Sequence, residues 1–214
     1  MGTSINSTQL TSILLSLADD VEARSDELRQ LDAAIGDGDL GITIQLGSEG
    51  MRQYLHSSPG QDIGQHLARC GMSINKASPS TFGTLLASAF MAAGKAVSGK
   101  TAITPTDLAL MGEAAIEGIK KRGHAEVGDK TMLDCLVPAA AAYKAAVESG
   151  VDPASALSAA VEAANAGMLS TVEMVSKHGR ASWHRENSVG VQDAGATAMY
   201  FMVESFARHA QQVQ

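Results

Sequence analysis

Three aspartates lie within eight residues of one another in the stretch LDAAIGDGDLGIT, which covers residues 31–43. Glycines separate them and allow a tight reversal of the backbone, which would bring Asp37 and Asp39 back towards Asp32. Three carboxylates held this close repel one another unless cations neutralise them or the side chains point apart. The stretch is therefore either an exposed turn rich in Asp and Gly or a metal site.

The residue types indicate which metal such a site would hold. Carboxylates without Cys or His nearby are hard oxygen ligands, which suit Mg²⁺ or Ca²⁺. The EF-hand pattern of Ca²⁺ loops is absent, because the twelfth position counted from Asp32 is Thr43 and not Glu. Mg²⁺ typically takes one or two carboxylates together with phosphate oxygens and water. A site in which Mg²⁺ also binds phosphate is therefore the more specific interpretation of this stretch.

Further loops combine glycines, small hydroxyl side chains and isolated cations, a mixture that suits nucleotide phosphates. No GxGxxG fingerprint followed by a βα unit is present, which argues against a dinucleotide-binding fold. Trp183 and Phe82 lie beside these loops and are interpreted as packing residues. The loops are NKASPSTFGT (75–84), KRGHAEVGDKTM (121–132), KHGRASWHREN (177–187) and VQDAGAT (191–197).

Composition favours an all-α protein with a single domain over residues 1–214. Hydrophobic residues make up 45% of the chain and aromatic residues only 4%, which favours packed helices over β-sandwiches or barrels. The net charge of −7 argues against nucleic acid as a partner. No apolar run or signal sequence indicates a membrane or export, so we expect a cytoplasmic protein in which Cys70 and Cys135 are buried, reduced thiols.

Helical periodicity covers nearly the whole chain. Apolar residues recur at steps of three and four, with acidic residues on the opposite face of the first segment, as in amphipathic helices. The pairs Thr104-Pro105 and Asp152-Pro153 have the residue types of helix starts. The pattern predicts eight helices, over residues 8–30, 41–56, 62–76, 82–98, 105–122, 132–149, 153–177 and 194–212.

Taken together, the motifs resemble those of the nucleotide-binding L subunit, or L domain, of dihydroxyacetone kinase. The resemblance lies in LDAAIGDGDLG, ASPSTFGT, RGHAEVGDKTM and GRASWHRENSVGVQDAGAT, which occur in the family's order and span almost the whole chain. It implies a barrel of about eight antiparallel amphipathic helices, with the nucleotide site in the loops at one end.

The resemblance also implies roles for individual residues. Asp32, Asp37 and Asp39 would hold two Mg²⁺ ions, and the loops would bind ADP or ATP. Asp37 and Arg180 would be the catalytic residues, with Arg180 stabilising the charge on the transferring phosphoryl group. The nucleotide contacts implied by the family pattern are Leu40, Gly41, Ile42, Thr43, Ala77, Ser78, Gly123, Met132, Arg180, Asp193, Ala194 and Gly195.

The family pattern further implies a partner. In the family, a separate K subunit or domain holds the sugar, a short-chain ketose such as dihydroxyacetone, so this chain would be a kinase subunit that is active only with a K-type partner. Some members consume ATP, and others keep ADP as a coenzyme that a phosphotransferase-system protein rephosphorylates. An unfused L chain favours the second kind. A homodimer stays open, and so does the alternative of a non-catalytic, nucleotide-bound adaptor that regulates a partner protein.

Three departures from the family pattern concern the phosphate loops. Leu40 stands in place of the common His, residues 75–79 replace a glycine-rich segment, and Ala194 stands in place of Pro. Lys76 either pairs with a phosphate or is a solvated lysine at a helix end. The departures bring into question the detailed phosphate contacts and suggest a different triose or a tetrose as the sugar.

Overall fold

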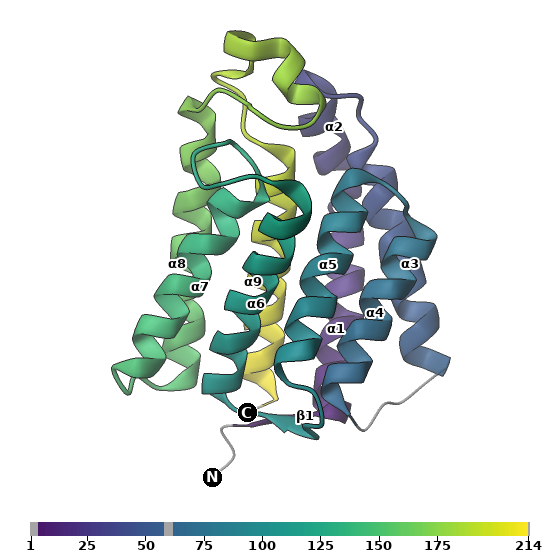
Figure 1. Cartoon of the computed structure of the whole chain (residues 1–214), viewed down its shortest axis with the longest axis vertical. Helices are drawn as coiled ribbons and strands as arrows, with labels where there is room; N and C mark the ends of the chain where they lie inside the picture. The colour runs from purple at the N-terminus through teal and green to yellow at the C-terminus, as the bar shows by residue number, and fades with distance from the viewer. Residues whose placement is uncertain (1–3, 58–61, 214) are drawn as a thin grey trace.

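The structure, a computed structural model, describes residues 4–57 and 62–213, and helices dominate it (Figure 1). The α-helices of this described part are α1 (Ser7–Glu22), α2 (Ser25–Ile35), α3 (Leu40–Ser57), α4 (Ile63–Ala77), α5 (Thr81–Ala96), α6 (Pro105–Gly123), α7 (Met132–Glu148), α8 (Pro153–Ser170) and α9 (Ala194–Gln212). Two short 3₁₀ helices, η1 (Thr171–Glu173) and η2 (Arg180–Ser188), and two strands, β1 (Ile5–Asn6) and β2 (Ala102–Ile103), complete the elements.

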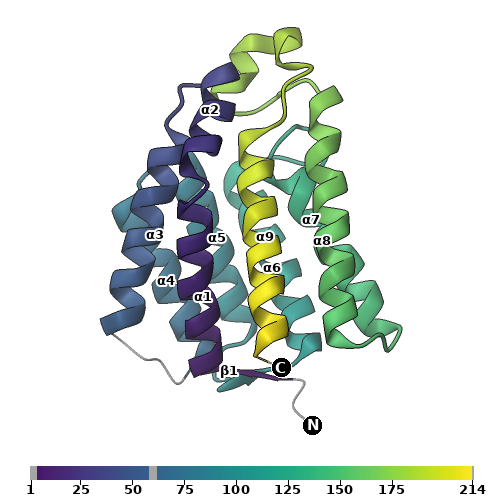
Figure 2. The same ribbon diagram turned by 180° about the vertical axis from the view of Figure 1, so that it is seen from behind.

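Eight of these helices form a closed ring. Each contacts the next in the order α1, α3, α4, α5, α6, α7, α8 and α9, and α9 returns to α1. Neighbours along the chain run in opposite directions, so the connecting loops alternate between the two ends of the ring (Figure 1, Figure 2). Helix α2 lies outside this order and contacts α3 and α9 at one end. The predicted all-α class of antiparallel helices is confirmed.

The other end of the ring holds the short sheet. Strand β1 pairs antiparallel with β2, with Ile5 opposite Ile103, and both isoleucines are buried in the core. The described part of the chain begins and ends at this same end (Figure 1, Figure 2). The loops at the opposite end are therefore left to build a site.

The predicted helix over residues 8–30 is wrong as one element, because the chain turns between Glu22 and Ser25. Arg24 leaves the helical conformation, with φ −98° and ψ 6°. Its guanidinium lies 4.9 Å from the ring centroid of Phe201 on α9, a cation–π contact. The apolar spacing continues across the break, so periodicity alone could not reveal it.

The predicted helix over residues 153–177 ends early, at Ser170. The cause is Thr171, which is fully buried. Its hydroxyl donates to the Met168 carbonyl at 2.6 Å and accepts from the Asp193 backbone N–H at 3.0 Å. A partner 22 residues further along the chain thus turns the backbone into η1.

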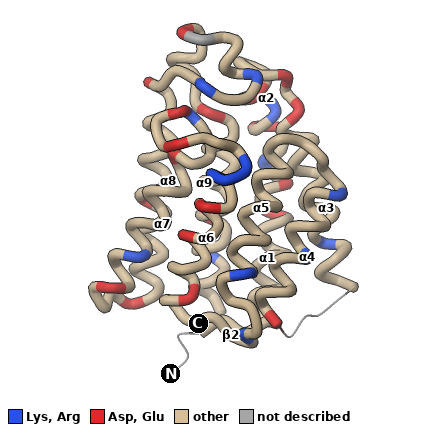
Figure 3. The backbone as a smooth tube through the Cα atoms, viewed as in Figure 1, with Lys and Arg blue, Asp and Glu red and all other residues tan. Residues whose placement is uncertain are grey.

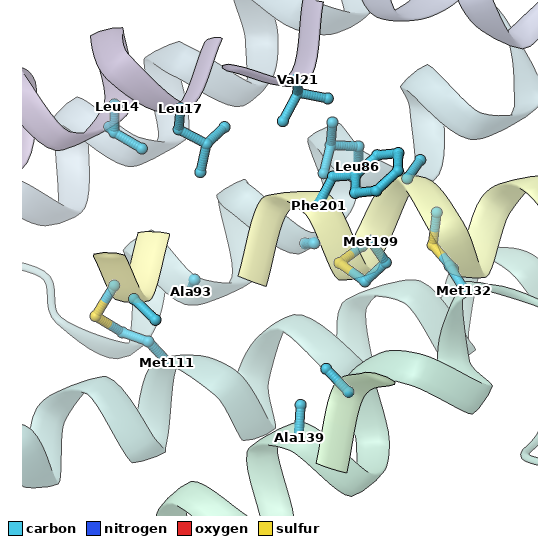
Figure 4. Close-up of a cluster of buried hydrophobic side chains, with 14 of the residues drawn as sticks. Leu14, Leu17, Val21, Leu86, Ala93, Met111, Met132, Ala139, Met199 and Phe201 are labelled. Atoms are coloured by element: carbon cyan, nitrogen blue, oxygen red, sulfur yellow. The ribbon is translucent and has the colours of Figure 1, made fainter. Parts of the chain in front are cut away.

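The core fills the interior of the ring with Leu, Ile, Met and Ala side chains, and leaves an apolar cavity of about 240 Å³. Figure 4 shows buried side chains from several helices, including Leu17, Leu86 and Met199. Cys70 and Cys135 are free and buried, as predicted, and burial raises the pKa of each thiol to about 12. Among the described residues, no helix combines the length and apolar character needed to span a membrane.

Candidate functional site

The loops opposite the β1–β2 sheet surround a pocket of about 480 Å³, within the usual size range for small-molecule sites. Its walls come from the end of α2, the α2–α3 turn, the start of α5, the end of the α6–α7 loop, the start of η2 and the start of α9. Figure 3 shows acidic and basic residues along the loops at this end. The pocket is thus built from segments of both halves of the ring.

The three aspartates of the LDAAIGDGDLGIT stretch converge at this pocket. One carboxylate oxygen from each of Asp32, Asp37 and Asp39 lies within 4.8 Å of the other two. Gly38 adopts a left-handed φ of +72°, and a Cβ at Gly36 would lie 2.4 Å from the Asp32 carboxylate. Glycine at both positions therefore lets the turn fold back over the end of α2.

Electrostatics favour a cation at this cluster. Partial burial and the nearby charge of Asp32 raise the pKa of Asp39, because negative charges held together disfavour ionisation. Arg180, from η2, forms an ion pair with Asp37. One oxygen of Asp32 also accepts the Leu40 backbone N–H at 3.2 Å, while further carboxylate oxygens of the cluster can serve as metal ligands. A donor set of carboxylate oxygens fits Mg²⁺.

Four helices begin at the pocket, namely α3, α5, α7 and α9, because alternate helices of the ring run away from this end. A Cβ at Gly195, near the start of α9, would lie 3.8 Å from the Met132 backbone nitrogen on α7 and 3.9 Å from the Phe82 ring on α5. The N-terminus of a helix carries partial positive charge and free N–H groups, which attract anions.

Side-chain caps fix the starts of three of these helices. The hydroxyl of Ser80 accepts the Gly83 N–H at 3.0 Å, and the carboxylate of Asp193 accepts the Ala196 N–H at 2.7 Å. The Thr131 hydroxyl caps α7 in the same way. Burial raises the pKa of Asp193 to about 6. The pocket therefore combines an acidic cluster on one side with several anion-attracting helix ends.

Most residues predicted for the site line this pocket: Asp32, Asp37, Asp39, Leu40, Met132, Arg180, Asp193, Ala194 and Gly195. Gly123 lies just behind the wall, since a Cβ there would be 3.0 Å from the side chain of Leu85, a lining residue. Gly41, Ile42, Thr43, Ala77 and Ser78 do not belong to the lining.

The predicted residues outside the lining have other surroundings. Gly41 is packed against the backbone of α2, where a Cβ would lie 2.4 Å from the Ser25 carbonyl oxygen. Thr43 and Ser78 are buried, while Ile42 is exposed. Ala77 faces α3, because a Cβ at Gly50 would lie 2.6 Å from the Ala77 side chain.

The structure adds lining residues that the sequence analysis did not single out, among them Ser80, Lys130, Thr131 and His178. Ser80 and Thr131 carry the residue types of helix caps, a signal that was available in the sequence. Lys130 and His178 stand in the loops 121–132 and 177–187 that the sequence marked for phosphates, but neither was given a role there. Lys76 is exposed and is not among the lining residues, so the solvated interpretation fits it.

The aromatic residues beside the loops differ from each other. Phe82 packs against the core as predicted. The packing interpretation of Trp183 is wrong, because 80% of this residue is exposed. It lies on η2, which sits outside the ring next to α2 (Figure 1).

Comparisons with known proteins extend this description. The DAK2 domain profile matches residues 34–208. The chain is 32% identical over 209 residues to the PEP-dependent dihydroxyacetone kinase ADP-binding subunit DhaL of Escherichia coli, covering 98% of this chain and all of that subunit. It is 30% identical over 185 residues to the L-erythrulose 1-kinase of Mycolicibacterium smegmatis, covering 86% of this chain and 32% of that kinase.

A solved structure shares the fold. The dihydroxyacetone kinase of C. freundii in complex with AMP-PNP and Mg²⁺ superimposes with a TM-score of 0.74 and 25% identity. The match covers 94% of this chain and 34% of that kinase. The chain thus spans about a third of the longer kinases and the full length of the E. coli subunit.

Proposed function

Because the chain belongs to the DAK2 domain family, we propose that it is the nucleotide-binding subunit of a kinase that phosphorylates a short-chain ketose. The observation that carries the proposal is the meeting of three aspartates and four helix N-termini in one pocket. The acidic cluster suits metal ions, and the helix ends suit phosphates, so one pocket can hold both parts of a magnesium nucleotide.

The proposed roles of the residues are those that the family pattern implies, and their positions in the pocket support them. Asp32, Asp37 and Asp39 hold two Mg²⁺ ions, which when bound neutralise the phosphate charge and orient the phosphates. The N–H groups at the starts of α3, α5, α7 and α9 face the phosphates. Arg180 exchanges its pairing with Asp37 for the transferring phosphoryl group and stabilises the charge that develops there.

The sugar is supplied by a separate K-type subunit. Two relatives support this: the E. coli protein is named as a subunit, and the C. freundii kinase is about three times longer than the part that this chain matches. The relatives also support a triose or tetrose as the sugar, since one is named for dihydroxyacetone and another for L-erythrulose. The E. coli relative is named PEP-dependent, which favours ADP as a retained coenzyme that a phosphotransferase-system protein rephosphorylates.

Nucleotide analysis of the purified protein tests the proposal. We expect denaturation to release ADP, identified by chromatography, and calorimetry to show binding of ADP that requires Mg²⁺. Exchangeable binding of ATP without retained ADP would instead indicate a subunit that consumes ATP. Binding of neither nucleotide would contradict the proposed function and favour an adaptor role.

Substitution of Asp37 tests the metal assignment within the same experiment. Asp37→Asn should lose the Mg²⁺-dependent binding of ADP with little loss in the free energy of unfolding, because it removes a ligand but also relieves carboxylate repulsion. The matched control is Asp26→Asn on α2, the helix before the turn that carries Asp37, where an exposed carboxylate lies 3.5 Å from Arg29. Normal ADP binding by Asp37→Asn would contradict the assignment.

A further inference from the structure

Lys130, in the GDKTM motif, is a buried lysine for which the proposed chemistry has no use. The residue is only 1% exposed. Its ammonium donates hydrogen bonds to three backbone carbonyls, those of Met174 at 3.1 Å, Ser188 at 2.5 Å and Val191 at 2.7 Å. An ammonium has three protons to donate, so all three are used on main-chain oxygens.

The three acceptors belong to one long connection, residues 171–193 between α8 and α9. Met174 ends η1, Ser188 ends η2, and Val191 precedes the start of α9. One side chain from the α6–α7 loop therefore joins three points of a segment that is 44 to 61 residues further along the chain. This connection carries Arg180 at its centre.

The backbone around Lys130 directs its side chain inward. Lys130 has a left-handed φ of +63°, an unfavourable conformation for a residue with a side chain. The carboxylate of Asp134 stabilises this turn, because it accepts the N–H of Gly128 at 2.6 Å and that of Thr131 at 2.7 Å. The geometry of the loop is thus fixed on both sides of the lysine.

Apolar burial does little to hold η2 in place. Trp183 is 80% exposed, and most of the described side chains of η2 are exposed or half-buried. Polar contacts hold the connection instead, since Asp129 pairs with Lys177 at 2.8 Å and with His178 at 3.0 Å. Burying an ammonium costs free energy unless it is fully hydrogen-bonded, so the three carbonyls of this connection bind Lys130 strongly.

We propose that Lys130 is a positioning residue that anchors the α8–α9 connection to the α6–α7 loop and thereby holds Arg180 over the aspartate cluster. The anchoring follows from the contacts of Lys130, and its consequence for nucleotide binding rests on the proposed function. Lys130 acts through backbone carbonyls and does not itself contact the phosphates.

Hydrogen exchange on the intact protein without nucleotide tests the anchoring. Lys130→Met keeps most of the buried stem and removes the three donors, so amides in residues 174–191 should exchange about tenfold faster or more, while the ring helices keep their protection. Lys121→Met removes an exposed lysine of α6 and should leave exchange unchanged. If Lys130→Met does not fold, Lys130→Gln, which keeps an N–H donor, should show the same local change at a smaller magnitude.

Calorimetry with ADP and Mg²⁺ tests the consequence. We expect binding by Lys130→Met to weaken about tenfold or more. Binding of ADP by Lys130→Arg should also be weakened, because a planar guanidinium cannot direct three N–H groups at carbonyl oxygens that converge on one point.

Four outcomes decide between the interpretations. Unchanged exchange over residues 174–191 in both Lys130→Met and Lys130→Gln would overturn the anchoring. Full binding by Lys130→Arg would overturn the positioning role in favour of a simple charge effect. Unchanged ADP binding by Lys130→Met despite faster exchange would also overturn the positioning role. Faster exchange in a protein whose unsubstituted form binds no nucleotide would support the anchoring and reject the proposed function.

Discussion

His66 on α4 shows how a single buried polar residue is satisfied. Its Nε2 lies 3.0 Å from the Thr11 hydroxyl and its Nδ1 lies 3.1 Å from the Tyr54 hydroxyl. The Thr11 hydroxyl donates its proton to the Ser7 carbonyl at 2.9 Å, so it accepts from His66. This network assigns a neutral ring that is protonated on Nε2 and accepts from Tyr54 on Nδ1. Burial lowers the pKa of His66.

This neutral histidine predicts a pH dependence of stability. The folded pKa lies below the unfolded value of about 6.5, so the unfolded chain binds the proton more readily. The contribution of the neutral ring to the free energy of unfolding is present above pH 6.5 and is lost as the pH falls through the lower folded pKa. The free energy of unfolding should fall by at most about 1.4 kcal/mol per pH unit in this range. Urea unfolding between pH 7.5 and 5 should show this loss in the unsubstituted protein and much less of it in His66→Gln.

The exposed His56 on α3 provides the control for this measurement. His56→Gln should keep the pH dependence of the unsubstituted protein. Equal slopes for His66→Gln and the unsubstituted protein would show that the buried ring does not cause the loss.

The packing of whole helices appears most clearly in two glycines of α6. A Cβ at Gly112 would lie 3.4 Å from the Ala140 side chain, and Gly112 borders the central cavity. A Cβ at Gly118 would lie 2.8 Å from the Ser88 carbonyl oxygen and 2.8 Å from the Ala92 side chain on α5. The same helix thus has room at one glycine and close backbone contact at the other.

Alanine at the two positions should have opposite effects. Gly112→Ala should raise the free energy of unfolding by about 0.5–1 kcal/mol, because alanine is the better helix former and the space is available. Gly118→Ala should lower it by about 1–3 kcal/mol, because α6 must move away from α5. Urea denaturation of both variants checks this, and a loss of stability in Gly112→Ala would show that the cavity side of α6 has no room.

At the scale of the whole molecule, the candidate site ties the two halves of the ring together. Its clustered aspartates come from the last turn of α2 and from the α2–α3 turn, and its other walls come from α5, α7, η2 and α9. A ligand that contacts all of these segments binds the folded protein and not the unfolded chain. Its binding free energy therefore adds to the stability of the whole ring.

Thermal unfolding should report this coupling. ADP with Mg²⁺ at a hundred times the dissociation constant should add about 2.7 kcal/mol and raise the melting temperature by roughly 5–11 °C for a domain of this size. Excess EDTA should remove most of the shift, and Asp37→Asn should not show it. An equal shift with and without Mg²⁺ would contradict a metal-bridged nucleotide.

Local signals in the sequence determined much of this protein. Periodicity and the cap residues Thr104 and Asp152 predicted the helices that begin at Pro105 and Pro153. Likewise, the glycines between the aspartates predicted that Asp32, Asp37 and Asp39 converge. These features depend on residues only a few positions apart, so the sequence displays them directly.

Only the tertiary structure decided the features whose causes lie far apart in the chain. Phe201 contacts Arg24 where the first predicted helix divides, Asp193 binds Thr171 where α8 ends, and Lys130 reaches a carbonyl 61 residues away. Periodicity records which face of a helix is apolar, but not which distant group meets it. The residues that form the walls of the pocket can therefore be identified only from the closed ring of helices.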